Sequence, residues 1–157
     1  MSVVAQLEKG RLRPEAETAA LLESMDGDGA MVSFVGVARP QDRMGRPVER
    51  LFLEHHERLT EESLRDIAEE ASARFEVSHV RVVHRCGEIG PGEPIVFAAA
   101  SSAHRRAAFE AADYLMDRLK TEAVFWKRED RVDGSDWIEP TADDHAARGR
   151  WSDTWPE

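Results

Sequence analysis

The 157-residue sequence predicts a single compact domain that mixes helices and strands. Two observations lead to this prediction. Hydrophobic residues make up 41% of a chain that contains no repeat or low-complexity tract, so one sizeable core can form. The spacing of these residues alternates along the chain between the 3.6-residue period of amphipathic helices and the short apolar runs of buried strands.

The predicted elements follow from this spacing and from capping and turn residues. Helices are expected at 14–25, from a cap at Thr60 to Phe75, and at 103–120 after a cap at Ser101 or Ser102. Strands are expected at 31–37, 50–55, 80–84, 94–100 and 123–128, with one more after a turn at Gly134. A polar loop over 39–47 that contains three arginines separates the first two strands.

The last predicted helix and the residues after it carry two further expectations. The helix over 103–120 should bury a stripe of Phe109, Ala112, Leu115 or Met116, and Leu119. The polar residues from Pro140 onward should form a loosely packed tail, apart from Trp151 and Trp155. The sequence therefore divides into a domain over 1–139 and a tail over 140–157.

Charge and cysteine content exclude several classes of protein. A formal net charge of −10 argues against general binding to nucleic acids or acidic membranes, which are held by broad basic surfaces. The single cysteine, Cys86, rules out an internal disulfide and indicates a reducing, cytoplasmic setting. No run of eighteen apolar residues is present, and the first ten residues lack the apolar stretch of a signal peptide. An anionic ligand must therefore meet a local basic pocket.

The scarcity of lysine is the most informative chemical feature. The chain has three lysines against eighteen arginines, and Lys120 and Lys127 flank a short hydrophobic run. Arginine serves every purely electrostatic purpose, whereas an amine can lose its proton and act as a nucleophile, acid or base. At Lys120 the amine would need a neighbouring cation or burial to favour its neutral form. The pair is therefore a candidate for catalysis.

A candidate anion site lies at the start of the helix over 103–120. His104 and Arg105 fall in its first turn, where free N–H groups and the helix dipole favour anions. About fifteen helical residues at roughly 1.5 Å each place Arg105 and Lys120 about 22 Å apart. They cannot bind one small substrate within one chain. If both serve one site, two chains must meet across a two-fold axis, each completing the other's site.

Other polar clusters carry weaker predictions. The run over 54–57, Glu-His-His-Glu, places adjacent histidines on opposite faces of a strand and is not expected to bind a metal. The glycine-rich turn over 86–93 joins two strands and does not open a helix, unlike a phosphate-binding loop. His84 and Cys86 share one face of a strand but receive no role.

Several ordered segments together resemble the MoaE family, the large catalytic subunit of molybdopterin synthase. They are Phe34-Val-Gly-Val-Ala-Arg39, the strand over 48–54, His84-Arg85-x-Gly87, Ser102-Ala-His104-Arg105, Leu119-Lys120, Trp126-Lys127-Arg128-Glu129 and Trp137. The resemblance runs over about 3–139. It implies an α+β domain of the α/β-hammerhead type, with antiparallel sheets and two to three helices. It also implies a homodimer at the core of a heterotetramer with a small ubiquitin-like, MoaD-like sulfur carrier.

The activity implied by the resemblance is the conversion of cyclic pyranopterin monophosphate to molybdopterin. Two sulfurs would come from the thiocarboxylate at the Gly-Gly end of the carrier, and no metal or cofactor is needed. Lys120 matches the lysine nearest the carrier's terminal carbonyl, and Lys127 matches the second active-site lysine. The matches in the substrate pocket are Val37, Ala38, Arg39, His104, Arg105, Arg128 and Glu129, together with both lysines.

The sequence departs from the family pattern at three places. Val124 stands where proline is common, and His56 stands where tyrosine is frequent. After Trp137, the family often has an arginine that enters the neighbouring pocket, but Pro140 and Thr141 occupy this stretch. The sequence offers Arg148 or Arg150 as a replacement.

Two other functions remain open from the sequence. One is a non-catalytic scaffold that binds a ubiquitin-like Gly-Gly tail in an apolar groove. The other is a lysine enzyme that forms a Schiff base with a carbonyl substrate. The presence of both Lys120 and Lys127 favours catalysis over the scaffold.

Overall fold

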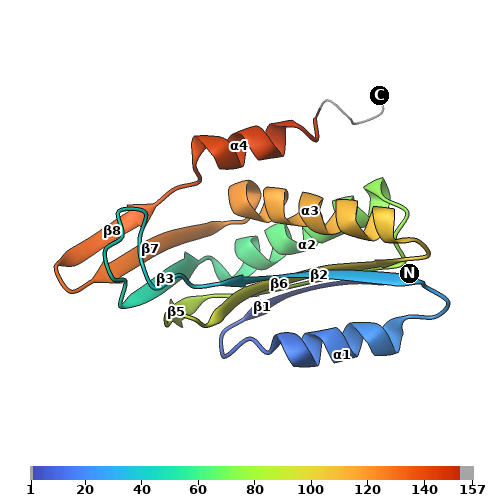
Figure 1. The fold of residues 1–157 in the computed structure, drawn as a ribbon, viewed down its shortest axis with the longest axis horizontal. Helices are drawn as coiled ribbons and strands as arrows, with labels where there is room; N and C mark the ends of the chain where they lie inside the picture. Colours follow the sequence, from blue (N-terminus) through green and yellow to red (C-terminus); the bar gives the residue numbers. More distant parts are fainter. Residues whose placement is uncertain (1, 153–157) are drawn as a thin grey trace.

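Two four-stranded sheets organise the chain in a computed structural model that describes residues 2–152 (Figure 1). The first sheet has the order β1-β4-β6-β2, formed by Ser2–Glu8, His79–Arg85, Pro94–Ser102 and Ala30–Val37. The second has the order β5-β3-β7-β8, formed by Gly87–Ile89, Arg50–His55, Phe125–Arg131 and Gly134–Ile138. Only β1 and β4 pair in parallel among these strands of the described chain. The predicted α+β fold is confirmed.

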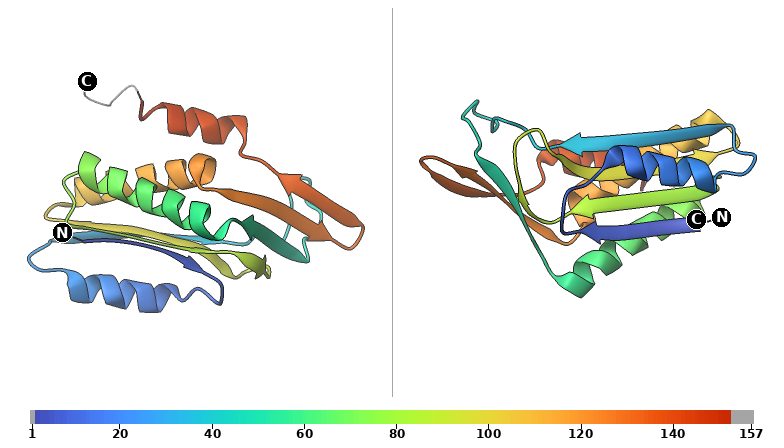
Figure 2. Two further views of the ribbon diagram at one scale, coloured as in Figure 1. Left: turned by 180° about the vertical axis from the view of Figure 1, so that it is seen from behind. Right: turned by 90° about the horizontal axis from the view of Figure 1, so that it is seen from below.

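The four described helices are α1 (Pro14–Ser24), α2 (Glu57–Arg74), α3 (Arg105–Glu122) and α4 (Ala142–Gly149). Three of them cover the two faces of the first sheet, and α4 packs on α3. Figure 2 shows α2 and α3 on one face and α1 on the other, while the second sheet extends beyond one end of this layer. None of the described helices is both long and apolar enough to cross a membrane.

The main core lies between the first sheet and the pair α2 and α3. Leu64 and Ile67 of α2 and Leu115 of α3 are among its buried side chains. A smaller cluster that includes Phe97 and Leu21 packs under α1. A third cluster includes Leu51 and Ile89 at the second sheet. This third cluster includes Ala38 and therefore joins the loop after β2 to the second sheet.

Both predicted helix caps were wrong. His56, not Thr60, caps α2, because its Nδ1 accepts the N–H of Leu59 at 3.1 Å. Thr60 is buried inside the helix. Ser101 and Ser102 are the last residues of β6, and α3 begins at Arg105 after His104. The strand continues because both serines are buried and satisfied, with Ser101 Oγ donating to Asp28 and Ser102 Oγ to the carbonyl of Glu76.

The prediction of a buried stripe on α3 is confirmed at Ala112, Leu115 and Leu119, which are buried. It is wrong at Phe109, which is 60% exposed. Alanines at 108 and 111 turn to the sheet instead. Adjacent helix positions point in different directions, so a helix that buries Ala108 turns Phe109 away from the core.

Three elements escaped the sequence prediction. β1 was missed because its pairing with β4 joins residues far apart in the chain. The three residues of β5 lie within the predicted turn over 86–93. α4 lies in the expected tail and packs against α3. Thr141 starts it with a capping box, in which Thr141 and Asp144 each accept the other's backbone N–H. Trp151 packs edge-on against Phe75 and Tyr114, whereas Trp155 lies outside the described residues.

Candidate functional site

The two lysines line one cavity of about 930 Å³ at the junction of the sheets. Lys120 lies in the last turn of α3 and is exposed, whereas Lys127 is half-buried on β7. Strand alternation turns Phe125, Lys127 and Glu129 to the cavity, and the register pairs Lys127 with Leu53 on one side and Ile138 on the other. The predicted pairing of the lysines in space is present in the structure.

The electrostatic environment favours a neutral amine at Lys127. Burial lowers the pKa of Lys127 below its usual value, and the charge of Lys120 lowers it further. Arg39 and Arg43 act in the same direction, and Glu129 opposes them. A larger fraction of such an amine is neutral, and thus available as a base or nucleophile, than of a lysine in water.

The segment after β2 forms one wall of the cavity. Val37, Ala38 and Arg39 all line it. The backbone of Ala38 is fixed on both sides, because its N–H donates to Glu93 at 2.9 Å and its carbonyl accepts from Gly92 at 2.8 Å. The glycine-rich turn over 86–93 therefore positions the wall that carries Arg39, and the turn leads into β6 and not into a helix.

His84 is a cavity residue that the sequence interpretation missed. Its ring stacks on Phe125 with centroids 4.3 Å apart, and Nδ1 lies 2.9 Å from the carbonyl oxygen of Arg85. Burial, with smaller effects from Lys127 and Lys120, lowers its pKa to about 4. The imidazole is therefore neutral near pH 7. The available signal was its place directly after the buried Val82 and Val83 of β4, but only the fold shows that this strand passes the two lysines.

His104 and Arg105 lie at the other end of α3, in a separate pocket of about 630 Å³. Phe109 and Arg106 also line this pocket. Among the described residues, none lines both this pocket and the lysine cavity. Within one chain, the structure thus keeps the predicted anion site apart from the predicted amines.

Arg128 faces away from the lysine cavity. Its guanidinium lies over the rings of Phe52 and Trp137, and its Nε donates to Asp130 at 2.7 Å. Glu129, the next residue, lines the cavity. Of the predicted substrate-pocket residues, the cavity thus brings together Val37, Ala38, Arg39, Lys120, Lys127 and Glu129.

The two candidate replacement arginines are engaged elsewhere. Arg148 pairs with Glu122 at 2.5 Å, and Arg150 pairs with Asp113 at 2.6 Å and Asp117 at 2.8 Å. Both contacts hold α4 on α3. Pro140 and Thr141 themselves line the lysine cavity.

The histidines of the run over 54–57 make separate contacts in the structure. Within residues 2–152, no cluster of three or more His, Cys, Asp or Glu side chains could hold a metal ion. His56 caps α2, and His55 Nε2 lies 4.0 Å from Cys86 Sγ. Burial also raises the pKa of the Cys86 thiol.

Comparisons with known proteins agree with this geometry. The family model described as MoaE protein matches residues 7–122. A molybdopterin synthase catalytic subunit from Pseudomonas aeruginosa is 43% identical over 94% of this chain and 98% of its own. A molybdopterin biosynthesis MoaE protein from Burkholderia ambifaria has a TM-score of 0.81 and 36% identity, covering 96% of this chain and 99% of its own. A molybdopterin synthase structure from Staphylococcus aureus has a TM-score of 0.77 and 28% identity, over 85% and 96%.

Proposed function

The chain belongs to the MoaE family, and on this basis we propose that it is the catalytic subunit of a molybdopterin synthase. It is a sulfurtransferase of molybdenum cofactor biosynthesis that converts cyclic pyranopterin monophosphate to molybdopterin. The observation that carries the proposal is the cavity in which Lys120 and Lys127 meet beside Arg39. This arrangement combines amines for acyl and proton chemistry with a fixed charge for an anion.

The carrier's thiocarboxylate would enter this cavity and present its terminal carbonyl to the lysines. Lys120, exposed at the end of α3, acts as an acid or base or as a transient acyl acceptor. Lys127, whose burial lowers its pKa and so makes its ammonium form a stronger acid, polarises or protonates the reacting group. Phe125 and the buried Leu51 and Leu53 help line the cavity and exclude water that would hydrolyse the thiocarboxylate.

Two copies of the chain complete each site in this proposal. α3 runs from Arg105 to Glu122, so Arg105 and Lys120 lie about 22 Å apart along it. A two-fold dimer places the His104 and Arg105 end of one subunit against the Lys120 end of its partner. The phosphate is then held by Arg39 of one chain and by His104 and Arg105 of the other. A small ubiquitin-like carrier on each chain gives a heterotetramer.

The division of the chain and its location are also parts of the proposal. The catalytic domain covers 1–139, and the segment that follows reaches the cavity with Pro140 and Thr141 and continues as α4. A cytoplasmic setting fits the single cysteine, which is free and buried.

The test is formation of the dithiolene product from cyclic pyranopterin monophosphate and a thiocarboxylated carrier. Lys120→Arg keeps the charge but removes the titratable amine, so we expect product from the native chain and a loss of about a hundredfold or more in the variant. Carrier binding should remain. A folded native chain that binds the carrier but makes no product would support a scaffold instead. Borohydride trapping of a carbonyl substrate on Lys120 would support a Schiff-base enzyme.

A further inference from the structure

A tight turn between β2 and β3 carries Arg43 next to the lysine cavity. Asp42 builds this turn, since its Oδ1 accepts the backbone N–H groups of Met44 and Arg46, each at 2.9 Å. The Asp42 carbonyl also accepts the N–H of Gly45 at 3.0 Å. Gly45 has a φ of 80°, which a residue with a side chain adopts only under strain. The conformation of the turn is therefore specified by its own residues.

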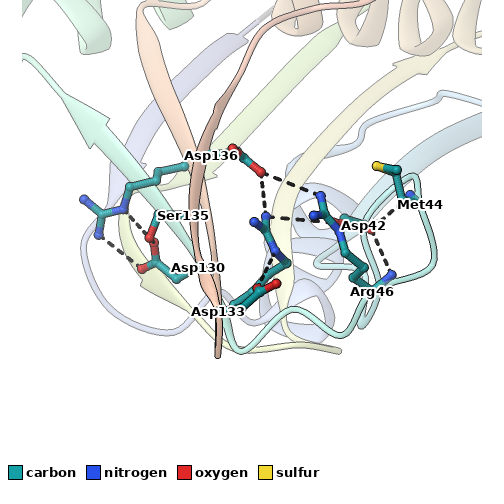
Figure 3. A network of polar contacts seen from close by, with 9 residues as sticks. Asp42, Met44, Arg46, Asp130, Asp133, Ser135 and Asp136 are labelled. Atoms are coloured by element: carbon teal, nitrogen blue, oxygen red, sulfur yellow. Dashed lines mark hydrogen bonds and ion pairs between the residues drawn. The ribbon is translucent and has the colours of Figure 1, made fainter.

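Ion pairs fix this turn to the hairpin of β7 and β8, as Figure 3 shows. Arg131 of β7 has a buried side chain that contacts Asp136 at 2.6 Å and Asp42 at 3.9 Å. Arg46 pairs with Asp42 at 2.8 Å and reaches Asp136 at 3.7 Å. Because β7 also carries Lys127, the network holds the turn in a fixed place relative to that amine.

Arg43 forms no close ion pair with a described carboxylate, although its charge lowers the pKa of Asp144, another residue of the cavity lining. Among the described residues, the side chains of Arg39 and Arg43 make no ion pair or hydrogen bond, although both line the cavity. Nearby Arg46, Arg128 and Arg131 are each paired with an aspartate. Six carboxylates also line the cavity, namely those of Asp42, Asp117, Glu129, Glu139, Asp143 and Asp144, but none of them forms an ion pair with Arg39 or Arg43. The two guanidinium groups therefore remain available to an anion that enters the cavity.

We propose that Arg43 is a further substrate-binding residue, whose guanidinium contacts the phosphate of the pterin substrate beside Arg39. This inference rests on the proposed function and adds a residue to its substrate site. The phosphate stays charged and unreacted throughout sulfur transfer, so it fits a permanently charged, planar guanidinium. The reacting thiocarboxylate instead requires groups that can exchange protons, which the two lysines provide.

The charge of Arg43 also acts on Lys127. The groups that face Lys127 are Lys120 from α3, Glu129 from β7, Arg39 and Arg43 from the loop after β2, and His84 from β4. Arg43 lowers the pKa of Lys127, so removal of its charge must raise that pKa. The limb of the kcat/KM profile that reports Lys127 should then move to higher pH. A defect in folding alone would not cause such a shift.

The experiment compares Arg43→Gln with Arg13→Gln in the full chain together with its carrier. Arg13 is an exposed arginine just before α1, on the far face of the first sheet, so its substitution removes the same charge away from the cavity (Figure 2). Titration calorimetry gives the affinity for cyclic pyranopterin monophosphate, and product formation gives kcat and KM. We expect Arg43→Gln to weaken pterin binding about tenfold, as for loss of one charge-assisted contact. Arg43→Lys should recover part of this loss, and Arg13→Gln should resemble the native chain.

Two results would overturn the assignment of Arg43. One is an unchanged pterin affinity in Arg43→Gln. The other is a loss of carrier affinity with no loss of pterin affinity, which would place the carrier's tail at Arg43. The calorimetric comparison is independent of turnover. If the native chain binds the pterin but makes no product, sulfur transfer is refuted while the binding data still decide the role of Arg43. If the native chain binds no pterin, both proposals fail.

Discussion

Acidification should destabilise the fold through His84. This half-buried imidazole stacks on Phe125 inside the lysine cavity. Burial is the main cause that lowers its pKa from 6.5 to about 4, and the charges of Lys127 and Lys120 lower it further. The contact with the Arg85 carbonyl acts in the opposite direction. The unfolded chain lacks this environment, so its histidine regains a pKa of about 6.5.

The sign and size of the effect follow from proton binding. Between pH 6.5 and 4, the unfolded chain binds a proton at His84 that the folded chain does not bind. The free energy of unfolding therefore falls as pH falls through this window, and the contribution of His84 is fully present above it. The difference between 6.5 and about 4, at about 1.4 kcal/mol for each pH unit, corresponds to about 3 kcal/mol.

Urea unfolding at pH 7, 5.5 and 4.5 measures this effect against a His84→Gln variant. Carboxylates with a lowered pKa, such as Asp28 and Asp130, also lose stability in acid, but they do so in both proteins. Glutamine does not titrate, so its intrinsic cost is the same at every pH. We expect the native chain to lose more stability than the variant, with the difference approaching about 3 kcal/mol near pH 4. Parallel pH profiles would refute this account of His84.

Three other predictions concern assembly and packing. Mixing inactive Arg105→Ala and Lys120→Ala chains under conditions of subunit exchange should restore part of the activity, because one site of the mixed dimer keeps both residues; no recovery would contradict a shared site. Leu115→Ala should lower the free energy of unfolding by about 3 kcal/mol, since Leu115 is fully buried. The matched control, Leu22→Ala at an exposed position, should lower it by under about 0.5 kcal/mol. Trp151→Ala should cost about 2 kcal/mol by removing ring contacts between the chain end and α3, and equal urea midpoints would disprove that role.

Local sequence signals predicted most of the fold. The strands with continuous apolar runs and the helices α1 to α3 appear close to their expected positions, because each has a clear period or cap. The sequence prediction failed where contacts between residues far apart in the sequence determine the structure. β1 is stabilised by pairing with β4, and Phe109 is turned outward because α3 buries the neighbouring Ala108 instead. The α4 helix did have a local signal, the capping box that begins at Thr141.

The candidate site shows the same division between local and distant information. The lysine pair was predictable because two rare residues flank one short segment. His84 and Arg43 were not predicted as members of the cavity, because β4 and the loop after β2 are far from α3 in the sequence. The separation of Arg105 from Lys120 followed from helix length alone, and the two separate pockets agree with it.

The link between α3 and β7 explains how the chain accommodates Val124, where the family resemblance leads us to expect proline. This link sets the distance between Lys120 and Lys127, so its conformation must be fixed. Ser63 Oγ accepts the Val124 N–H at 3.1 Å, a bond that proline cannot form because it lacks that proton. Thr60 Oγ donates to the Val124 carbonyl at 2.6 Å. Two hydrogen bonds from α2 thus replace the constraint of a proline ring, and the buried Thr60 that failed as a helix cap contributes to the geometry of the lysine pair.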